Sequence, residues 1–431
     1  MSKAMLIARK VLSPIRNSFQ QIIDNCITLR HLGCDSFYEY MTDDRFYIDE
    51  NFLQRNTLKI LIYARNFPAF GGGEKHMAYF CKYFENKHPT AEINILVDNS
   101  RTRKVFAYNY PNLDRLKEQF NIELKRTKLI KRHFIDQDFI TRLSYHYDIF
   151  INSTIRSRFY GLAKKNYYNC MFPPTPEAHF NLTDSVIKKT YSCFITNSHF
   201  TDQWLHKYWG DDIKSLCIYP PVLSSEDLDG RVGKMKKRNI VITVGRFFYG
   251  AHSKRQDAMI DFWLKNEQNF TDWEFHLVGN RQENAVDKKF IKQILKKAKK
   301  SSRIFIHFDL KFPELERLYR EAKIYWHAAG FGLSESEDPA KMEHFGITTV
   351  EAMSYGVVPV VIDKGGQTEI VDDGVNGYRW NDEERWLEAT KDLMRNDDKR
   401  EEMAISAQAK VLNYTVEAFY AKCDSLFYTG D

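Results

Sequence analysis

Short runs of β-branched and aromatic residues alternate with helical runs along most of this chain. In the first half, the strand-like runs are 58–63, 93–97, 147–152, 167–171 and 193–197. The second half repeats the pattern at 239–244, 275–278, 304–307, 324–326 and 357–361. Strands that alternate with helices favour parallel sheets with helices on both faces. The sequence therefore predicts an α/β protein with two doubly wound parallel sheets.

The length and the position of one polar segment predict how the chain is divided. A chain of 431 residues favours two or three domains over one. Residues 223–238 are mostly polar and charged and contain two glycines, so we interpret them as an interdomain linker. We predict an N-terminal extension at 1–56, a first domain at 57–222 and a second domain at 239–412. A final helical run is expected within residues 413–431.

The most informative motif runs from Glu343 to Glu351 and places two carboxylates eight residues apart. Gly346 and the threonines after it predict a helix start, at which Thr348 or Thr349 would cap backbone amides. A helix N-terminus offers free N–H groups and a partial positive charge, which suit a phosphate. The alternative interpretation is a capped surface helix that carries two solvated glutamates.

Glycines follow the first strand-like run of each half. Residues 71–73 are all glycine and precede Lys75 and a helical run, a pattern that brings backbone amides close to a ligand. This loop is not a P-loop, because no second glycine precedes Lys75 at the required spacing and no Ser or Thr follows it. In the second half, Gly245 and Arg246 follow the strand, and Lys254 stands just before the next helix.

Basic residues are concentrated in the first half. The net charge is +6, yet residues 58–200 hold 22 Lys+Arg and 12 Asp+Glu, so that segment carries 22 − 12 = +10 and the rest is net acidic. Residues 125–133 form the densest basic cluster, and Arg156, Arg158, Lys164 and Lys165 add to it. This charge indicates an anionic partner, such as a phosphorylated acceptor or a membrane surface. A basic face that only aids solubility is the alternative.

Together these motifs resemble the retaining GT-B glycosyltransferases of family 4, the glycosyl transferases group 1. The glycine loop at 71–75 resembles that family, and so do the strand at 356–361 and the glycine loops at 365–367 and 374–378, in that order. The resemblance covers residues 58–428. It implies two Rossmann-like domains that face a cleft, the first for an acceptor and the second for a nucleotide sugar. The helix at 413–431 would then cross back to the first domain.

The same resemblance implies roles for single residues. Glu343, Arg246 and Lys254 would be catalytic, with Glu343 at the donor sugar and the two cations on the leaving diphosphate, whose growing charge they would stabilise. Glu351 would accept hydrogen bonds from the ribose hydroxyls. The residues implied for donor binding are Gly72, Gly73, Gly245, Arg246, Lys254, Gly346, Ile347, Thr348, Thr349 and Glu351.

The implied reaction is retaining transfer of a hexose from a nucleotide-diphosphate donor to a glycan or lipid-linked acceptor, as in polysaccharide biosynthesis. No metal or other cofactor and no nucleic-acid partner is expected. Residues 136–138 and 227–229 match the letters of an Asp-x-Asp metal motif, but neither follows a clear strand. The histidine that many family members place near the reacting hydroxyl has no counterpart in residues 170–174.

Two other functions fit the same motifs. A nucleotide-sugar hydrolase or epimerase of this fold would share the diphosphate site but would need no acceptor. A non-catalytic, transferase-like subunit would bind a partner enzyme through residues 1–56. Intact Glu343, Glu351, Arg246 and Lys254 argue against the second alternative, because such a subunit is free to lose them.

The sequence also bears on location. No apolar run approaches the roughly 18 residues that a membrane span needs, and the first residues lack the apolar core of a signal peptide. The seven cysteines have no metal-binding spacing, which favours reduced thiols. We expect a cytoplasmic protein that could associate peripherally with a membrane. Residues 5–23 favour either a basic amphipathic helix at a membrane interface or a helix packed on the enzyme.

Overall fold

The computed structural model describes residues 57–428, with gaps at 66, 68–70, 99–112, 133–134, 156, 176–181, 230–235, 251–252 and 282–284. The chain divides into two compact units. The described residues of the first unit fall within 57–117, 123–168 and 182–192, and those of the second within 118–122, 169–175 and 193–428. The extension predicted at 1–56 lies outside the described residues, and the domain boundaries predicted from the sequence stay predictions.

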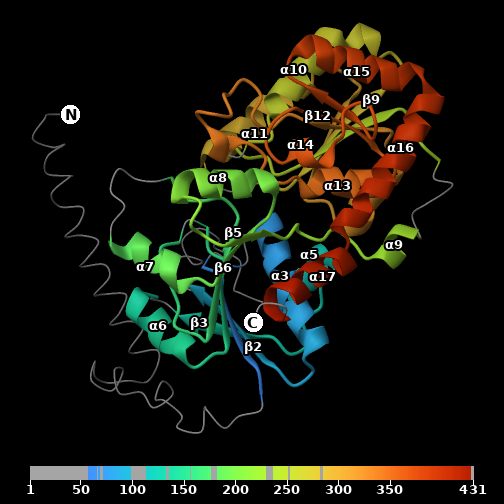
Figure 1. Ribbon diagram of the computed structural model, residues 1–431. Helices are drawn as coiled ribbons and strands as arrows, with labels where there is room; N and C mark the ends of the chain where they lie inside the picture. The colour runs from blue at the N-terminus through green and yellow to red at the C-terminus, as the bar shows by residue number, and fades with distance from the viewer. Residues whose placement is uncertain are drawn as a thin grey trace, which may run out of the picture. The chain divides into compact units, whose positions relative to one another are not determined.

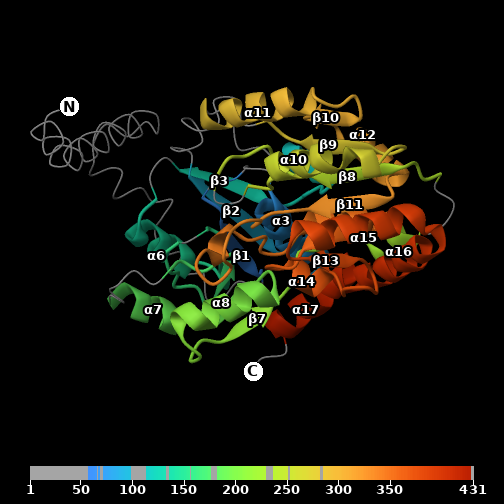
Figure 2. The same ribbon diagram turned by 90° about the horizontal axis from the view of Figure 1, so that it is seen from above.

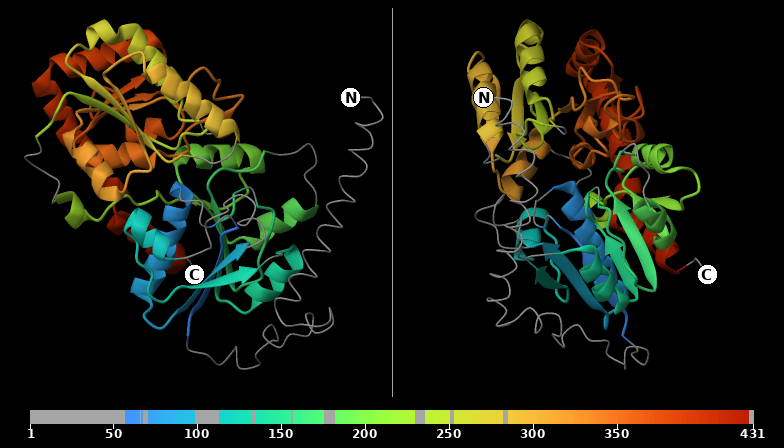
Figure 3. Two further views of the ribbon diagram at one scale, coloured as in Figure 1. Left: turned by 180° about the vertical axis from the view of Figure 1, so that it is seen from behind. Right: turned by 90° about the vertical axis from the view of Figure 1, so that its left-hand side faces the viewer.

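Seven strands form the first sheet, in the order β3-β2-β1-β4-β5-β6-β7, and Figure 3 shows them as blue and green arrows. Within this sheet, β1 pairs in parallel with β2 on one side and with β4 on the other. All four residues of β4 are buried, which fits a strand covered on both faces. The strands are β1 (Lys59–Tyr63), β2 (Glu92–Asp98), β3 (Lys128–Arg132), β4 (Ile149–Asn152), β5 (Lys165–Cys170), β6 (Cys193–Thr196) and β7 (Ser215–Cys217).

Helices connect these strands, and polar residues mark where several of them begin. The Asp136 side chain accepts a hydrogen bond from the Phe139 amide at 2.8 Å and so caps α6. Ser198 caps α8 in the same way through the Thr201 amide at 3.0 Å. The helices between the strands of this sheet are α3 (Gly72–Lys87), α5 (Asp114–Phe120), α6 (Gln137–Tyr145), α7 (Leu182–Thr190) and α8 (His199–Trp209).

The second sheet has six strands in the order β10-β9-β8-β11-β12-β13, and its pairs are parallel. Every residue of β8 and β12 is buried, because helices cover both faces of the sheet. The strands are β8 (Ile240–Val244), β9 (Glu274–Gly279), β10 (Ile304–Phe308), β11 (Ile324–His327), β12 (Val358–Ile362) and β13 (Tyr378–Trp380).

Two helical layers enclose this second sheet. In Figure 1, α10 and α15 lie on one side of it and α13 and α14 on the other. Figure 2 shows α11 beside α10, which it contacts. The helices of this part of the chain are α9 (Ser225–Asp229), α10 (Gln256–Asn266), α11 (Ala285–Ala298), α12 (Phe312–Glu321), α13 (Ile347–Ser354), α14 (Gln367–Ile370), α15 (Glu383–Arg395), α16 (Asp397–Val411) and α17 (Val416–Tyr428).

Stacked aromatic rings fill the core between the second sheet and the layer of α10 and α15. The Trp386 ring stacks on Phe262 at 3.8 Å between centroids and on Trp380 at 4.3 Å. Trp326 packs edge-on against Trp386 at 5.0 Å. All four side chains are buried. Rings of this size dominate the apolar area removed from water, so this core anchors the strands that carry the site described below.

The structure confirms all ten strand-like runs predicted from the sequence, and the final helical run is α17. It adds β3, β7 and β13, which we had not predicted as strands, and it places α9 inside the predicted linker. Within the basic cluster, the Arg126 guanidinium donates to the backbone carbonyls of Glu85 and His88, and Arg132 is buried. Arg126 therefore links the segment before β3 to the end of α3.

One helix cap was predicted wrongly. Neither Thr348 nor Thr349 caps α13, because the helix begins after Gly346 and has no side-chain cap. Among the described residues, no helix is long and apolar enough to cross a membrane.

Candidate active site

Two segments of the second unit leave the carboxyl edge of its sheet side by side. Strands β8 and β11 are neighbours, although the chain runs from β8 out to β9 and β10 before it returns to β11. The connections after β8 and β11 therefore diverge in opposite directions along the sheet. Open parallel sheets bind ligands at such a switch point, so this edge is where a site is expected.

Lys254, His327 and Glu343 meet at this edge. The Glu343 carboxylate accepts hydrogen bonds from Lys254 Nζ and, at 3.0 Å, from His327 Nε2. The side chains of Lys254, Glu343 and His327 are 22%, 15% and 3% exposed, so the cluster is mostly shielded from water. The structure thus brings together two of the three predicted catalytic residues and adds a histidine.

The surroundings of the cluster determine its protonation. Burial by itself would raise the pKa of Glu343, but the Lys254 ammonium and the hydrogen bond from His327 outweigh it, so this pKa lies well below its usual range. Burial lowers the pKa of His327. We therefore assign a neutral His327 that carries its proton on Nε2 and donates it to an ionised Glu343. Its Nδ1 is buried and has no hydrogen-bond partner among the described residues.

Two glycines allow the Glu343 loop to pack closely. A Cβ atom at Gly365 would lie 2.3 Å from the Glu343 carbonyl oxygen, and one at Gly366 would lie 2.4 Å from the His344 carbonyl oxygen. Gly365 also has a φ of +60°, which favours glycine. The Gly366 amide donates to the Glu343 carbonyl at 2.8 Å. The glycine pair therefore fixes the backbone that carries Glu343.

The start of α13 is fixed by one buried amide side chain. Gly346 has a φ of +119°, and a Cβ there would lie 2.0 Å from Gln367 Nε2. Gln367 donates to the Phe345 carbonyl at 3.2 Å and accepts from the Thr349 hydroxyl at 2.9 Å. The Thr348 hydroxyl lies 2.8 Å from that of Tyr325. Both threonine side chains are thus engaged elsewhere. The amides of Thr349 and Val350 donate to the Gly346 carbonyl at 3.0 and 3.3 Å, which leaves the amides of residues 346–348 for a ligand.

The loop after β8 packs against Lys254. A Cβ at Gly245 would lie 2.6 Å from Lys254 Cγ, so only glycine leaves room for the lysine stem. Gln256 Nε2 donates to the carbonyls of Gly245 at 3.2 Å and Arg246 at 3.1 Å, which fixes this loop to the start of α10. Arg246 itself is exposed. The predicted cations therefore differ, since Lys254 is held in an ion pair and Arg246 faces solvent.

The remaining predicted site residues lie at two other places. Glu351 is on the body of α13, where it accepts a hydrogen bond from the Tyr319 hydroxyl of α12 at 3.4 Å. Gly72 and Gly73 form the first turn of α3, in the first unit. The Gly71 amide at the start of that helix donates to the Glu74 carboxylate at 2.8 Å.

His327, Gln256 and Gln367 were not predicted as site residues. His327 directly follows the run predicted as a strand at 324–326, so its place at the carboxyl end of that strand was a signal for it. The two glutamines are buried and act only through backbone carbonyls and one hydroxyl, for which the sequence offers no signal. Within the described part of the chain, no three His, Cys, Asp or Glu residues are grouped as a metal site would need.

Known proteins give the site a context. Residues 224–410 match the family model described as Glycosyl transferases group 1. A curated protein of Neurospora crassa, GDP-Man:Man(3)GlcNAc(2)-PP-Dol alpha-1,2-mannosyltransferase, is 24% identical over 228 residues. That match covers 48% of this chain and 37% of the Neurospora protein, so this chain spans little more than a third of that relative.

Solved structures resemble almost all of the described chain. HepE from Anabaena in complex with UDP and glucose has a TM-score of 0.62 at 15% identity, over 86% of this chain and 100% of HepE. A glycosyltransferase from Rickettsia africae has a TM-score of 0.63 at 16% identity, over 87% of this chain and 99% of that one. A mutant of TarM from S. aureus has a TM-score of 0.63 at 13% identity, over 86% of this chain and 100% of that one. These likenesses confirm the predicted GT-B fold with its two parallel-sheet, Rossmann-like domains.

Proposed function

We propose that this chain, which carries a glycosyl transferases group 1 domain at residues 224–410 of a GT-B fold, is a retaining glycosyltransferase. It moves a hexose from a nucleotide-diphosphate sugar to a glycan or lipid-linked acceptor, without a metal cofactor. The names of the relatives support both substrates. The Neurospora protein is named for a GDP-mannose donor and a lipid-linked acceptor, and HepE was solved with UDP and glucose.

One observation carries the proposal: a shielded lysine–carboxylate pair stands at the switch point of the second sheet, in the same unit as the uncapped N-terminus of α13. Lys254 and Glu343 form that pair. A diphosphate at this edge would meet the ammonium of Lys254 and the first amides of α13. Arg246, which is exposed and lies two residues beyond β8, would be a second cation for it. Fixed cations of this kind stabilise the charge that a leaving diphosphate gathers. They supply the positive charge that other transferases take from a metal ion.

The two glutamates would bind other parts of the donor. Glu343 is ionised, so it accepts hydrogen bonds from hydroxyls of the donor sugar and stabilises positive charge at the anomeric carbon. Glu351, which lies about one helical turn beyond the start of α13, accepts hydrogen bonds from the ribose hydroxyls. The amides of residues 346–348 and the two cations hold the diphosphate between them, whereas the Thr349 amide, also predicted for this role, donates to the Gly346 carbonyl.

Retention requires the acceptor to attack on the face that the diphosphate leaves. The bond from the anomeric carbon to the phosphate oxygen breaks, and its electron pair stays on the diphosphate. The acceptor oxygen forms the new bond to the anomeric carbon, and its proton passes to the departing phosphate oxygen. Because the leaving group serves as the base, this mechanism needs no histidine in residues 170–174.

A nucleotide-release assay tests the proposal. The full chain is incubated with UDP-, GDP-, ADP- and dTDP-sugars, with and without a lipid-linked acceptor extract. Acceptor-dependent release from one donor, lost in Lys254→Ala and Glu343→Ala, is the expected result. Lys265→Ala is the matched control, because this lysine, on the helix α10 that begins two residues after Lys254, forms an exposed pair with Glu383. Release without acceptor would favour a hydrolase, and the absence of donor binding in the unaltered chain would refute the assignment.

A further inference from the structure

One residue beside the site has a backbone conformation that its side chain disfavours. Arg255 directly follows Lys254 and has a φ of +56° and a ψ of +39°, in the left-handed region. A glycine takes this conformation without strain, whereas a residue with a Cβ adds a steric cost. Strain of this kind persists where the surrounding structure holds the residue in place, and it is concentrated at functional sites. An arginine at this position therefore indicates a role for its side chain.

The Arg255 guanidinium joins the start of α10 to the loop that follows β11. It donates a hydrogen bond to the Phe331 carbonyl and lies 5.8 Å from the centre of the Phe331 ring. Its Nε and Nη2 face the two carboxylate oxygens of Asp257, at 3.2 and 3.4 Å. A guanidinium has five N–H donors in a rigid plane, so it can bind a carboxylate and a carbonyl at the same time. A lysine ammonium is a compact point charge and lacks this geometry.

A second cation holds the same loop from the side of β12. Lys364, two residues beyond that strand, donates to the Leu333 carbonyl at 2.5 Å, and its Nζ lies 3.5 Å from the Gly330 carbonyl. Between these contacts, the Phe331 ring packs edge-on against Trp380 at 5.4 Å between centroids. Three carbonyls of the segment 330–333 are therefore bound to cations, which fixes the backbone of this segment.

The loop held in this way connects two members of the Lys254 cluster. It runs from His327, at the end of β11, to Glu343, and these two side chains are joined by a hydrogen bond. Arg255 is the neighbour of Lys254 in the chain and the N-cap of α10, so it connects the backbone that carries the lysine with the loop that leads to Glu343. A shift of this loop by about 1 Å would change the separation of the two charges. Misplacement of a catalytic group by that distance can cost on the order of 100-fold in rate.

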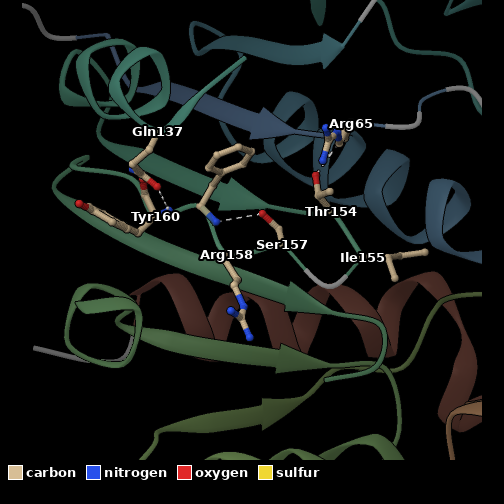
Figure 4. Close-up of a pocket in the computed structure, with 8 residues that line it drawn as sticks. Arg65, Gln137, Thr154, Ile155, Ser157, Arg158 and Tyr160 are labelled. Carbon is tan, nitrogen blue, oxygen red and sulfur yellow. Dashed lines mark hydrogen bonds between the residues drawn. The ribbon is translucent and has the colours of Figure 1, made fainter. Parts of the chain in front are cut away.

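The first sheet shows that a loop at a switch point can be fixed without such strain. Residues 157–160, which follow β4, line a cavity of about 500 Å³ at the switch point between β1 and β4. Gln137, the first residue of α6, donates to the Tyr160 carbonyl at 2.8 Å and accepts from the Tyr160 amide at 3.1 Å (Figure 4). Gln137 has no positive φ. A neutral side chain at an ordinary helix start is thus enough to hold a loop, so the strain at Arg255 indicates a further function.

We propose that Arg255 is a positioning residue of the donor site, which sets Lys254 against Glu343 without contacting the substrate itself. Its left-handed backbone fixes the direction of Lys254 relative to α10, and its guanidinium fixes the loop 328–342. The inference rests on the proposed function, because that function assigns the cluster to the donor. It adds a residue that contributes to turnover through the placement of two others.

Nucleotide release under saturating donor and acceptor, measured beside urea unfolding, tests the proposal in the full chain. Arg255→Gly removes the guanidinium and the backbone strain together, and we expect it to lower kcat roughly 10- to 100-fold. Asp309→Gly is the matched control, because Asp309 has a φ of +55° and pairs with Arg281 at 2.6 Å, just beyond the edge strand β10. The two variants should change the urea midpoint by similar amounts, whereas Asp309→Gly should keep the kcat of the unaltered chain.

Guanidinium ion provides a second readout that a purely structural role would not move. Added below its denaturing concentration, it should restore part of the kcat of Arg255→Gly by binding between Asp257 and the Phe331 carbonyl. It should not raise the kcat of Lys254→Ala, which lacks the positioned group itself. Arg255→Lys retains the charge and the strain but not the planar group, so it should stay as slow as Arg255→Gly.

Three results would overturn the proposal. A kcat of Arg255→Gly equal to that of the unaltered chain would remove the role, and an equal kcat loss in Asp309→Gly would reduce it to stability. A loss that guanidinium ion does not restore would assign the effect to the backbone alone. The proposed function fails separately, because it fails if the unaltered chain releases no nucleotide from any donor, whereas this inference fails in variants of an active chain.

Discussion

The position of Glu343 depends on a glycine that can be altered without touching the carboxylate. In Gly365→Ala, the new methyl group would lie 2.3 Å from the Glu343 carbonyl oxygen and 3.1 Å from Met342 Cβ. Real Cβ atoms stay beyond about 3 Å, so the loop must move by roughly 1 Å. The prediction is therefore a catalytic loss that is transmitted through the backbone.

Gly365→Ala should affect both stability and turnover. An alanine at a φ of +60° is strained by about 1–2 kcal/mol, whatever surrounds it. The displaced loop adds a second effect on turnover, since a misplacement of about 1 Å in a catalytic group can cost on the order of 100-fold. We expect Gly365→Ala to lower kcat by roughly 100-fold and the free energy of unfolding by about 2 kcal/mol or more.

Gly374 provides the control. It has a φ of +76°, but a Cβ there would meet nothing within 4 Å. Gly374→Ala should therefore show the backbone strain alone, with about 1–2 kcal/mol lost in urea unfolding and kcat nearly unchanged. The assay is nucleotide release under saturating donor and acceptor, beside urea unfolding of both variants. Equal kcat values for the two variants would refute the argument that Gly365 positions Glu343.

Three further predictions concern charge. In a double-mutant cycle of Lys254→Met and Glu343→Gln, the coupling free energy should be about 1–3 kcal/mol in urea unfolding, and a value near zero would exclude the ion pair. Because the pKa of Glu343 is depressed in the folded chain, its share of the stability is present above the unfolded pKa of about 4.3 and is lost as pH falls towards the folded pKa. The unfolding free energy of the unaltered chain should exceed that of Glu343→Gln by less and less below pH 4. A difference that stays constant down to pH 3 would contradict this sign. Burial lowers the pKa of Lys237 to about 7 in the folded chain. Above that pH the lysine is protonated in the unfolded chain but not in the folded one, so the unfolding free energy rises with pH. Relative to Lys237→Met, the unaltered chain should gain roughly 1–2 kcal/mol in unfolding free energy between pH 7 and 9, whereas Lys236→Met, an exposed control, should change nothing.

The strands were predictable because burial on both faces leaves a direct trace in the sequence. Ile240–Val244 and Val358–Ile362 are continuous apolar runs, apart from one threonine and one proline, and every residue in them is buried. A run of this kind fits a covered parallel strand and little else of that length. The same reasoning failed for Lys128–Arg132, whose three basic residues surround Leu129 and Ile130. An edge strand is only partly covered, so it can carry charged residues and lacks the continuous apolar run by which the other strands were recognised.

The error at α13 has a physical reason. Thr348 and Thr349 fit a capping pattern, but their hydroxyls are used by Tyr325 and Gln367, which lie far from them in the sequence. Local preference predicts a cap only where no tertiary partner competes for the same hydroxyl. The positive φ of Gly346 ends the loop instead.

The site residues themselves were predictable, but their relation was not. Lys254 and Glu343 are 89 residues apart, and the family resemblance implied separate roles for them, one at the diphosphate and one at the sugar. In the structure they neutralise each other. Under the proposed function, a diphosphate that draws Lys254 towards itself weakens the pair and leaves an ionised, largely buried Glu343 with His327 as its remaining donor. Hydroxyls of the donor sugar can replace the lost hydrogen bond, whereas a nucleoside diphosphate without its sugar cannot. The pair thus makes binding of the charged end of the donor depend on the presence of its sugar.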